Sequence, residues 1–380
     1  MADTVSWELL RRLAAYRAER GCALSVYFKL DPSEVPTQRE VLSRLTSLLD
    51  GAQRKAESLR PELAHEELVA LRSDLQRVRT WFETDFDRSG VHGAAVFAAG
   101  LGGVFRAVLL SEPVPDLVRL GRAFALTPLV PLVGRADGAL VVAVGRERGS
   151  LYRVMSGRLL EVADLTEEQL NRHDQGGWSQ ANYQRHVDAH AKEHLKDVAD
   201  ELARRVRQLH PSEVVVVGAD ETRAQFLDLL PAEARTAVVG GAHAEAHAGP
   251  SELYDVSAPL LREARLLRER EVLGRWREET ATEGRAVAGW EETLEAASDA
   301  RVDVLLLRIG ASREAYQCRS CGRVSARAGA CPLDGAELDP APDGADLAVH
   351  QTLTHGGSVL VVEASSDLDP VGGIGALLRY

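Results

Sequence analysis

The sequence GGWSQ at positions 176–180 opens a long polar segment, residues 181–209, that we predict to be one helix stopped by Pro211. Short apolar segments rich in β-branched residues stand on both sides of it, and each predicts a strand. Strands that alternate with helices indicate an α/β fold with a mixed sheet and helices on its faces. The predicted strands are residues 139–144, 151–155, 159–162, 214–217 and 237–239.

This pattern forms a central block, residues 135–260, with a further block on each side. The first block, residues 1–134, combines strand patterns with two helical patterns and ends in a proline-rich stretch. The third block, residues 261–380, starts within a charged segment, residues 258–297, that predicts one long helix, and it includes a buried strand at 302–308. Because 380 residues are too many for one compact core, we predict three α/β domains with these boundaries.

Charge and hydropathy limit the partners of the chain. Its net charge of −12 argues against a protein that coats nucleic acid, so we expect no DNA partner, whereas a local RNA contact stays open. No apolar run reaches the roughly 18–20 residues that span a bilayer. The N-terminal residues 1–20 form a charged amphipathic pattern unlike a signal peptide. We therefore expect a cytoplasmic protein without a membrane partner.

A second glycine-rich segment, GGIGALLRY at residues 372–380, ends the chain. Together with residues 176–180 it resembles the archaeal and eukaryotic class I peptide release factors and their relative Pelota, in particular a bacterial branch of that family. The resemblance implies a C-terminal α/β/α domain similar to kink-turn-binding ribosomal proteins. The Asn-Ile-Lys-Ser loop with which release factors read stop codons does not occur in residues 1–134, so the resemblance does not imply stop-codon reading.

In this family a Gly-Gly-Gln loop enters the peptidyl-transferase centre of the ribosome, where the peptidyl-tRNA ester is hydrolysed. The resemblance implies catalytic roles for Gly176, Gly177 and Gln180. Glycines permit close approach to RNA, and a glutamine amide can order water or stabilise an oxyanion. Because two residues separate Gly177 from Gln180, the loop is most similar to that of a divergent branch, which includes the peptidyl-tRNA-cleaving factor of eukaryotic ribosome quality control. From the residues alone, an ordinary loop with Ser179 or Asn182 as helix cap stays open.

The resemblance therefore implies a ribosome-associated peptidyl-tRNA hydrolase in ribosome rescue or quality control, with rRNA and the P-site peptidyl-tRNA as partners. A translational GTPase is a further partner that the family suggests. The alternative is a non-catalytic rescue or hibernation factor that occupies the empty decoding site, since Pelota lacks the glutamine loop. We expect no organic cofactor, because the glycine-rich turns lack the spacing of a nucleotide-binding loop.

The predicted helix after the loop carries basic residues and histidines. His186, His190 and His194 recur every four residues and so share one face. This face could lie along rRNA or tRNA, could chelate a metal, or could be a solvated surface with intrahelical ion pairs. With the first alternative, the residues expected to contact RNA are Trp178, Arg185, His186, His190, Lys192 and Lys196.

A cysteine-bearing insertion, residues 316–335, has the spacing C-x2-C-x9-C-x2-D. Two such pairs, each followed by glycine, are typical of a zinc ribbon with one structural zinc. His350 or His355 could replace the aspartate as fourth ligand, and a ribbon that has lost its metal is a further alternative. The predicted ligands are Cys318, Cys321, Cys331 and Asp334.

Overall fold

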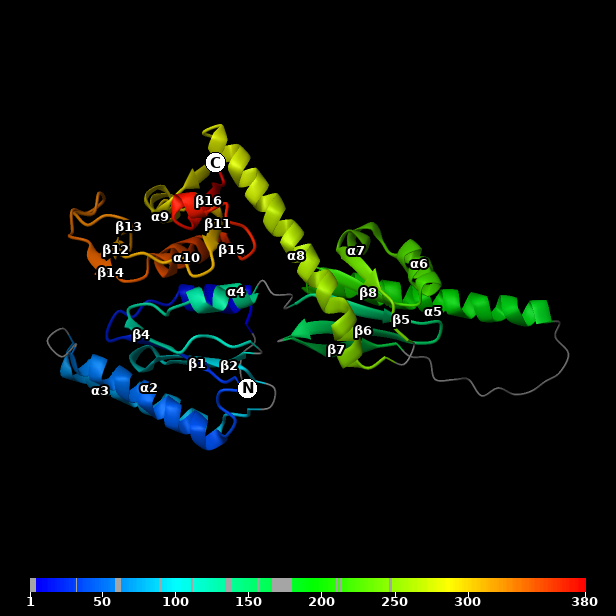
Figure 1. Cartoon of the computed structure of the whole chain (residues 1–380), viewed down its shortest axis with the longest axis horizontal. Helices are drawn as coiled ribbons and strands as arrows, with labels where there is room; N and C mark the ends of the chain where they lie inside the picture. Colours follow the sequence, from blue (N-terminus) through cyan, green and yellow to red (C-terminus); the bar gives the residue numbers. More distant parts are fainter. Residues whose placement is uncertain are drawn as a thin grey trace. The chain divides into compact units, whose positions relative to one another are not determined.

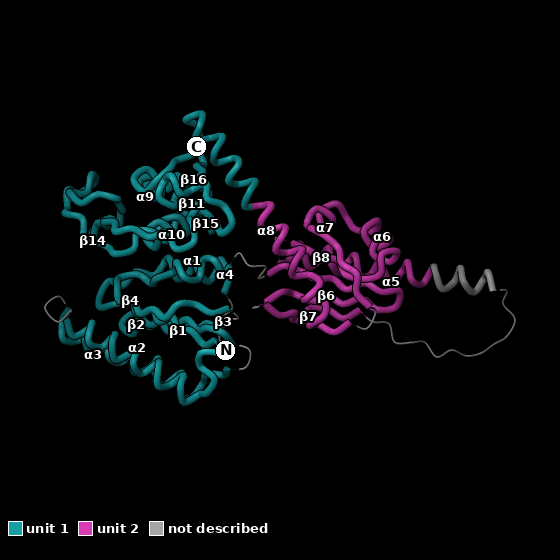
Figure 2. Tube along the Cα trace, viewed as in Figure 1, with its two compact units in different colours: residues 1–134, 269–380 teal, residues 135–268 magenta. Residues whose placement is uncertain are grey.

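We analysed a computed structural model of the 380-residue chain (Figure 1). The chain divides into two compact units (Figure 2): unit 1 comprises Met1–Gly134 and Glu269–Tyr380, and unit 2 comprises Arg135–Arg268. For residues 180–188 the structure describes the helix backbone without the side chains. The described residues are 5–31, 33–58, 63–88, 91–110, 112–133, 138–155, 157–165, 180–209, 211, 213–245 and 248–380.

Unit 2 contains a five-stranded mixed sheet of order β7-β6-β5-β8-β9. The strands β5, β8 and β9 run parallel, whereas β5, β6 and β7 form an antiparallel meander. All five strands predicted for the central block are present, and the α/β class is confirmed. Their bounds are β5 Leu140–Val144, β6 Gly149–Met155, β7 Arg158–Asp164, β8 Val214–Gly218 and β9 Val238–Ala242.

Helices cover both faces of this sheet. On one face, α5 (Gln180–Leu209), α6 (Asp220–Leu229) and α7 (Ala232–Thr236) enclose a core with the strands. On the other face, Leu253 and Leu261 of α8 (Pro250–Ala281) pack against the sheet. Because β5 and β8 are covered on both sides, their sequences are nearly continuous runs of valine.

The N-terminal part of unit 1 is built on an antiparallel sheet of order β3-β2-β1-β4. The helices α2 (Gln38–Ser58) and α3 (His65–Thr84) pack together on one face of it (Figure 1). The short helices of this part are α1 (Trp7–Ala14) and α4 (Val130–Val133). The strands are β1 Ala23–Lys29, β2 Gly93–Ala99, β3 Val104–Leu110 and β4 Leu117–Gly121.

The C-terminal part of unit 1 has a sheet of order β10-β16-β11-β15, in which only β11 and β15 are parallel. The end of α8 packs on one face, and α9 (Trp290–Ser298) and α10 (Gly344–Thr354) pack on the other. A small sheet of order β13-β12-β14 forms between β11 and α10. The strands are β10 Ala286–Ala288, β11 Val302–Arg308, β12 Ala315–Gln317, β13 Val324–Ser325, β14 Asp339–Ala341, β15 Ser358–Val362 and β16 Ile374–Leu378.

The first and third blocks of the sequence share one hydrophobic core. Tyr27 and Phe97 of the N-terminal sheet belong to the same buried cluster as Leu294, Leu305 and Val349 of the C-terminal part. The division into three domains stays a prediction, whereas the two blocks together form unit 1.

The prediction of one helix over residues 258–297 is wrong. The structure has α8, then β10, then α9. The helix ends where Glu283 has a φ of 51° and Gly284 donates a backbone hydrogen bond to Glu279 at 2.8 Å. A left-handed residue there stops the helix, and the apolar residues that follow join the sheet edge. Among the described helices, none has an apolar stretch long enough to cross a bilayer.

Candidate functional site

The predicted catalytic loop lies largely outside the described residues. Gly176, Gly177 and Trp178 are not described, and Gln180 is the first residue of α5, with its backbone alone described. The side chains of Arg185 and His186 also lie outside the described part. The catalytic assignment of the loop and these contacts with RNA therefore stay predictions.

The helix that follows the loop is anchored by its C-terminal part. An apolar stripe of α5 packs on the sheet of unit 2, and among the described side chains of this helix the first buried one is Ala191. Ala189 and His190, the first residues with described side chains, are exposed. At a rise of 1.5 Å per residue, about 16 Å of helix separates Gln180 from Ala191. The buried stripe continues through Leu195, Val198, Ala199, Leu202, Ala203 and Val206.

The histidines of α5 differ in their surroundings. His190 is exposed, as are Lys192 and Lys196, so all three are accessible for contact with a nucleic acid. His194 is only 2% exposed, and its ring lies over Gly149 of β6, where an added Cβ would be 3.4 Å from Nε2. The structure thus corrects the prediction of one shared histidine face: His194 belongs to the interface between helix and sheet.

Ion pairs occupy the C-terminal end of α5. The nearly buried carboxylate of Glu201 accepts a hydrogen bond from Nε of Arg205 at 2.7 Å and also pairs with Arg204. Arg207 lies 3.8 Å from Glu233 of α7. Arg204 and Arg205 thus form ion pairs within the helix, and Arg207 links it to α7.

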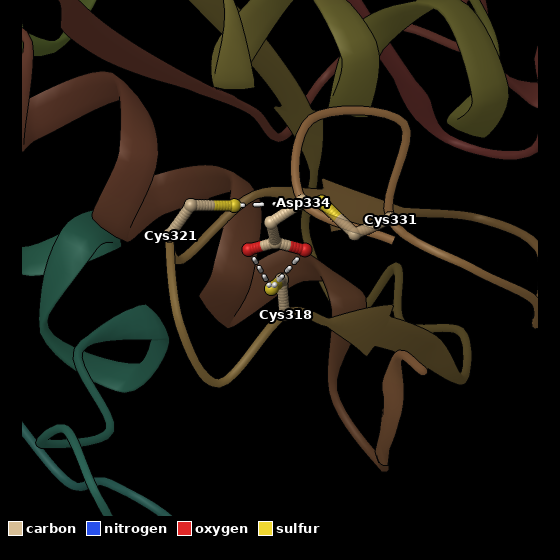
Figure 3. Close-up of side chains that lie close together, drawn as sticks. All are labelled: Cys318, Cys321, Cys331 and Asp334. Atoms are coloured by element: carbon tan, nitrogen blue, oxygen red, sulfur yellow. Dashed lines mark hydrogen bonds between the residues drawn. The ribbon is translucent and has the colours of Figure 1, made fainter. Parts of the chain in front are cut away.

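In the small sheet region of unit 1, the four predicted metal ligands come together (Figure 3). One donor atom from each of Cys318, Cys321, Cys331 and Asp334 lies within 4.8 Å of the others. The Cys318 Sγ is 3.2 and 3.6 Å from the two oxygens of Asp334, and Cys321 Sγ is 3.5 Å from Cys331 Sγ. All three thiols are free. A tetrahedral zinc with Zn–S bonds near 2.3 Å places sulfurs about 3.8 Å apart, so this donor set fits a metal ion with little movement.

Two similar turns present these donors. In the first, the N–H of Gly322 donates to the carbonyl of Cys318 at 3.1 Å, and in the second Gly335 donates to Cys331 at 2.9 Å. Gly322 has a φ of 79° and Gly335 a φ of 71°, a region that favours glycine. Each turn therefore favours the glycine that follows its ligand pair in the sequence. The two turns direct both ligand pairs toward the same point.

Backbone groups favour the ligating forms of two donors. The N–H of Cys321 hydrogen-bonds the Cys318 thiol and lowers its pKa. The N–H of Ala336 donates to Asp334 at 3.0 Å and lowers the pKa of that carboxyl. Since metals bind thiolate and carboxylate, these hydrogen bonds favour metal binding.

The two histidines that could have replaced Asp334 face other groups. His350 Nε2 hydrogen-bonds the carbonyl of Phe124, and its Nδ1 lies 3.4 Å from the carbonyl of Ala14. His355 Nδ1 is 3.2 Å from the carbonyl of Ala297. Asp334 is therefore the fourth member of the cluster, and within the described residues no other group of ligating side chains comes together in this way.

Comparison with known proteins finds that this chain is similar to release factors. The profile of bacterial archaeo-eukaryotic release factor family 10 matches residues 125–265, which include the sheet of unit 2, the 176–180 loop and α5. Peptide chain release factor subunit 1 of Methanopyrus kandleri is 27% identical over 224 residues, 56% of this chain and 53% of that protein. The chain thus spans about half the length of the archaeal release factors it matches. Protein Rv2629 of Mycobacterium tuberculosis is 25% identical over 304 residues, 77% of this chain and 79% of that protein.

Among solved structures, a model of ribosome-bound archaeal Pelota and ABCE1 matches with a TM-score of 0.44 and 11% identity, covering 100% of this chain and 95% of that one. A crystal structure of the archaeal translation termination factor aRF1 matches with a TM-score of 0.26 and 16% identity, covering 99% of each chain. Both TM-scores are below 0.5, so the similarity to release factors rests on the sequence matches alone.

Proposed function

The chain is related to the bacterial archaeo-eukaryotic release factors, and we propose that it acts on the ribosome and promotes hydrolysis of the peptidyl-tRNA ester. The observation that carries this proposal is the family match over residues 125–265, because that region includes the Gly177-x-x-Gln180 loop together with the helix behind it. The reaction belongs to ribosome rescue or quality control, since the first block lacks the stop-codon-reading loop.

The length of α5 supports this role. A protein that acts inside another particle must carry its reactive loop well beyond its own core. The helix extends about 16 Å from Ala191, the first buried residue among its described side chains, to Gln180. A hydrogen-bonded helix is stiff over this length, so it can present the preceding loop to a narrow site without unfolding any part of unit 2.

In the proposed reaction, a water oxygen attacks the ester carbonyl carbon, the bond to the tRNA 3′-oxygen breaks, and a proton passes to that oxygen. Gly176 and Gly177 let the backbone approach the tRNA end closely. The Gln180 amide holds the water in attack geometry, and such positioning can supply up to roughly 7–11 kcal/mol of barrier reduction. Trp178 stacks on a base near the ester. Proton transfer is left to the ribosome and the tRNA 2′-hydroxyl.

Contacts with RNA would come from the exposed face of α5. Lys192 and Lys196 are exposed four residues apart on one face, His190 is exposed at another position of the helix, and Arg185 and His186 precede them in the sequence. Lysines on one helix face can bind phosphates, whereas the net charge of −12 keeps the rest of the surface from binding RNA non-specifically.

We also propose that the cluster of unit 1 binds one structural Zn²⁺. Four protein donors complete a tetrahedron and leave no coordination position for a substrate. The metal would therefore take no part in the proposed ester hydrolysis. Its role would be to fold the region that contains residues 316–335 and the small sheet β13-β12-β14, because three strands of only two or three residues offer little core of their own.

The decisive experiment is peptide release from stalled ribosome–nascent-chain complexes by the purified protein. We expect release by the wild type and a loss of at least tenfold in Gln180→Ala and Gly177→Ala. Ser179→Ala serves as the control, because Ser179 precedes α5 as the candidate helix cap and the change leaves Gly177 and Gln180 in place.

Binding to ribosomes is measured in the same samples by co-sedimentation. If the wild type sediments with ribosomes and releases no peptide, the protein is a non-catalytic rescue or hibernation factor. If Ser179→Ala impairs the protein and Gln180→Ala does not, the loop is an ordinary helix start.

A further inference from the structure

The segment that links α1 to β1, residues 14–18, packs within unit 1 against α10 and the loop that follows β4. The carbonyl of Ala14 accepts a hydrogen bond from the Thr354 hydroxyl at 3.4 Å. The Tyr16 ring stacks on Phe124 with centroids 5.0 Å apart. The N–H of Ala18 donates to the carbonyl of Arg122 at 2.7 Å. The segment is thus held on both sides by backbone and ring contacts.

Arg17, in the middle of this segment, reaches the first metal-ligand turn. A Cβ built on Gly322 would lie 3.6 Å from one of its guanidinium nitrogens. Burial lowers the pKa of Arg17, and the neighbouring Cys318 and Cys321 act in the opposite direction. A cation from the N-terminal part of the chain therefore lies beside the sulfur ligands of the C-terminal part.

The same turn is fixed to α10. The side-chain amide of Gln351 donates to the carbonyl of Gly322 at 2.8 Å, and that of Gln317 donates to the same oxygen at 3.3 Å. Gly322 also carries the N–H that closes the turn onto Cys318. Movement of this turn would therefore change its contacts with both α10 and Arg17.

Charge explains why a cation belongs here. Three thiolates and a carboxylate around a divalent ion leave a net charge of about −2, which is costly in a partly buried site unless it is balanced. Arg323, which interacts with Cys331 of the cluster, is shared with Asp299 at 2.6 Å and Glu295 at 3.8 Å. The guanidinium of Arg17 supplies the remaining positive charge beside Cys318 and Cys321.

We propose that Arg17 is an outer-sphere charge partner of the metal centre, so that metal binding fastens residues 14–18 against the C-terminal part of unit 1. The inference rests on the metal proposed above. Because coupling between two events is reciprocal, a metal centre whose net negative charge attracts Arg17 holds the segment, and a correctly packed segment strengthens metal binding. Metal loss then loosens the junction between the first and third blocks of the chain.

The first test is Zn²⁺ affinity of the full-length protein, measured by competition with a chromophoric chelator. We expect Arg17→Gln to weaken Zn²⁺ binding by about tenfold, in the range seen for outer-sphere partners, and Arg17→Lys to weaken it less. Arg20→Gln is the matched control, because Arg20 lies just beyond the same segment and pairs with the exposed Glu66 instead. Its affinity should equal that of the wild type.

The second test is hydrogen exchange at the amide of Ala18 in the wild type and in Arg17→Gln, with Zn²⁺ and after chelation. In the wild type chelation should speed exchange at this amide, and in the variant the effect of chelation should shrink. A wild type that takes up no Zn²⁺ overturns both the metal proposal and this inference. This inference alone is overturned if Arg17→Gln binds Zn²⁺ with the affinity of the wild type, or if hydrogen exchange at Ala18 does not change with Zn²⁺.

Discussion

The Oδ1 atom of Asp346 accepts hydrogen bonds from the backbone N–H and the hydroxyl group of Thr127, at 3.0 and 2.9 Å. The same oxygen accepts from the N–H of Leu126 at 2.6 Å. One carboxylate at the start of α10 therefore satisfies three donors of a segment 219 residues away, and it helps join the first and third blocks of the chain.

Replacing Asp346 with alanine should lower the free energy of unfolding of unit 1 by about 1–3 kcal/mol, because partly buried N–H groups lose their acceptor. Denaturant unfolding followed by tryptophan fluorescence measures the change. Asp303→Ala, at an exposed position of β11, should stay within about 0.5 kcal/mol of the wild type. Equal stability of the two variants would show that the Asp346 contacts contribute nothing.

Packing explains why a glycine stands at position 375 of the C-terminal segment. A Cβ on Gly375 would lie 2.8 Å from Nε1 of Trp276, whose indole donates to the carbonyl of Val287 at 3.0 Å. Gly375→Ala should therefore destabilise unit 1 by about 1–3 kcal/mol through overpacking. Gly274→Ala, in open space on the same helix α8 as Trp276, should stabilise by about 0.5–1 kcal/mol. Thermal unfolding distinguishes the two, and a shift of the same sign in both variants would contradict this account.

Local patterns predicted much of this fold. The strands β5 and β8 of unit 2 were predictable because each is a short valine-rich run bounded by glycine or polar residues, as Val214–Gly218 is. The four metal ligands were predictable from spacing, because each pair needs only one turn. The identity of the fourth ligand needed coordinates, since only they show that His350 faces the carbonyl of Phe124.

Other features depend on contacts that no local pattern contains. The union of the first and third blocks rests on pairs such as Asp346 and Thr127, which are remote in sequence. His194 has the same helical spacing as His190, yet it points into the core, because the apolar stripe that decides the inward face begins at Ala191. The end of α8 near Glu283 likewise follows from the sheet edge that the next residues join.

Two carboxyl groups of α3 should give opposite pH dependences. Burial raises the pKa of Asp74 above 3.8, against a hydrogen bond from the N–H of Gly100. Its contribution to stability is fully present below pH 3.8 and is lost as the pH rises through its folded pKa. The N–H groups of Ala64 and Gly21 lower the pKa of Glu67 below 4.5, so its contribution is present above pH 4.5 and is lost as the pH falls through its folded pKa.

Unfolding free energy measured from about pH 3 to pH 7 tests this assignment. In the wild type, Asp74 should lower the unfolding free energy as the pH rises within this window, and this decrease should be absent in Asp74→Asn. Glu67 should lower it as the pH falls, and this decrease should be absent in Glu67→Gln. Each variant is the control for the other. If the slope of unfolding free energy against pH changes in the same direction in both variants, the causes assigned to the two pKa shifts are ruled out.

Lys192 and Lys196 are four residues apart on α5 and both are exposed. If they bind ribosomal phosphates, replacing both with glutamine should weaken ribosome binding at moderate salt. The slope of log affinity against log salt should also fall by about 1 to 2, because fewer counterions are released. Co-sedimentation at several salt concentrations measures both quantities.

The control for this variant carries the same change in net charge. Arg207→Gln with Arg235→Gln removes two exposed cations of unit 2 that pair with Glu233 and Asp228, at 3.8 and 3.9 Å. Non-specific attraction between ribosome and protein would be weakened equally by both double variants, since it depends on total charge. A phosphate contact of Lys192 and Lys196 requires the lysine variant alone to lose the salt-dependent part of its binding. An equal loss in both double variants would remove this lysine pair from the interface.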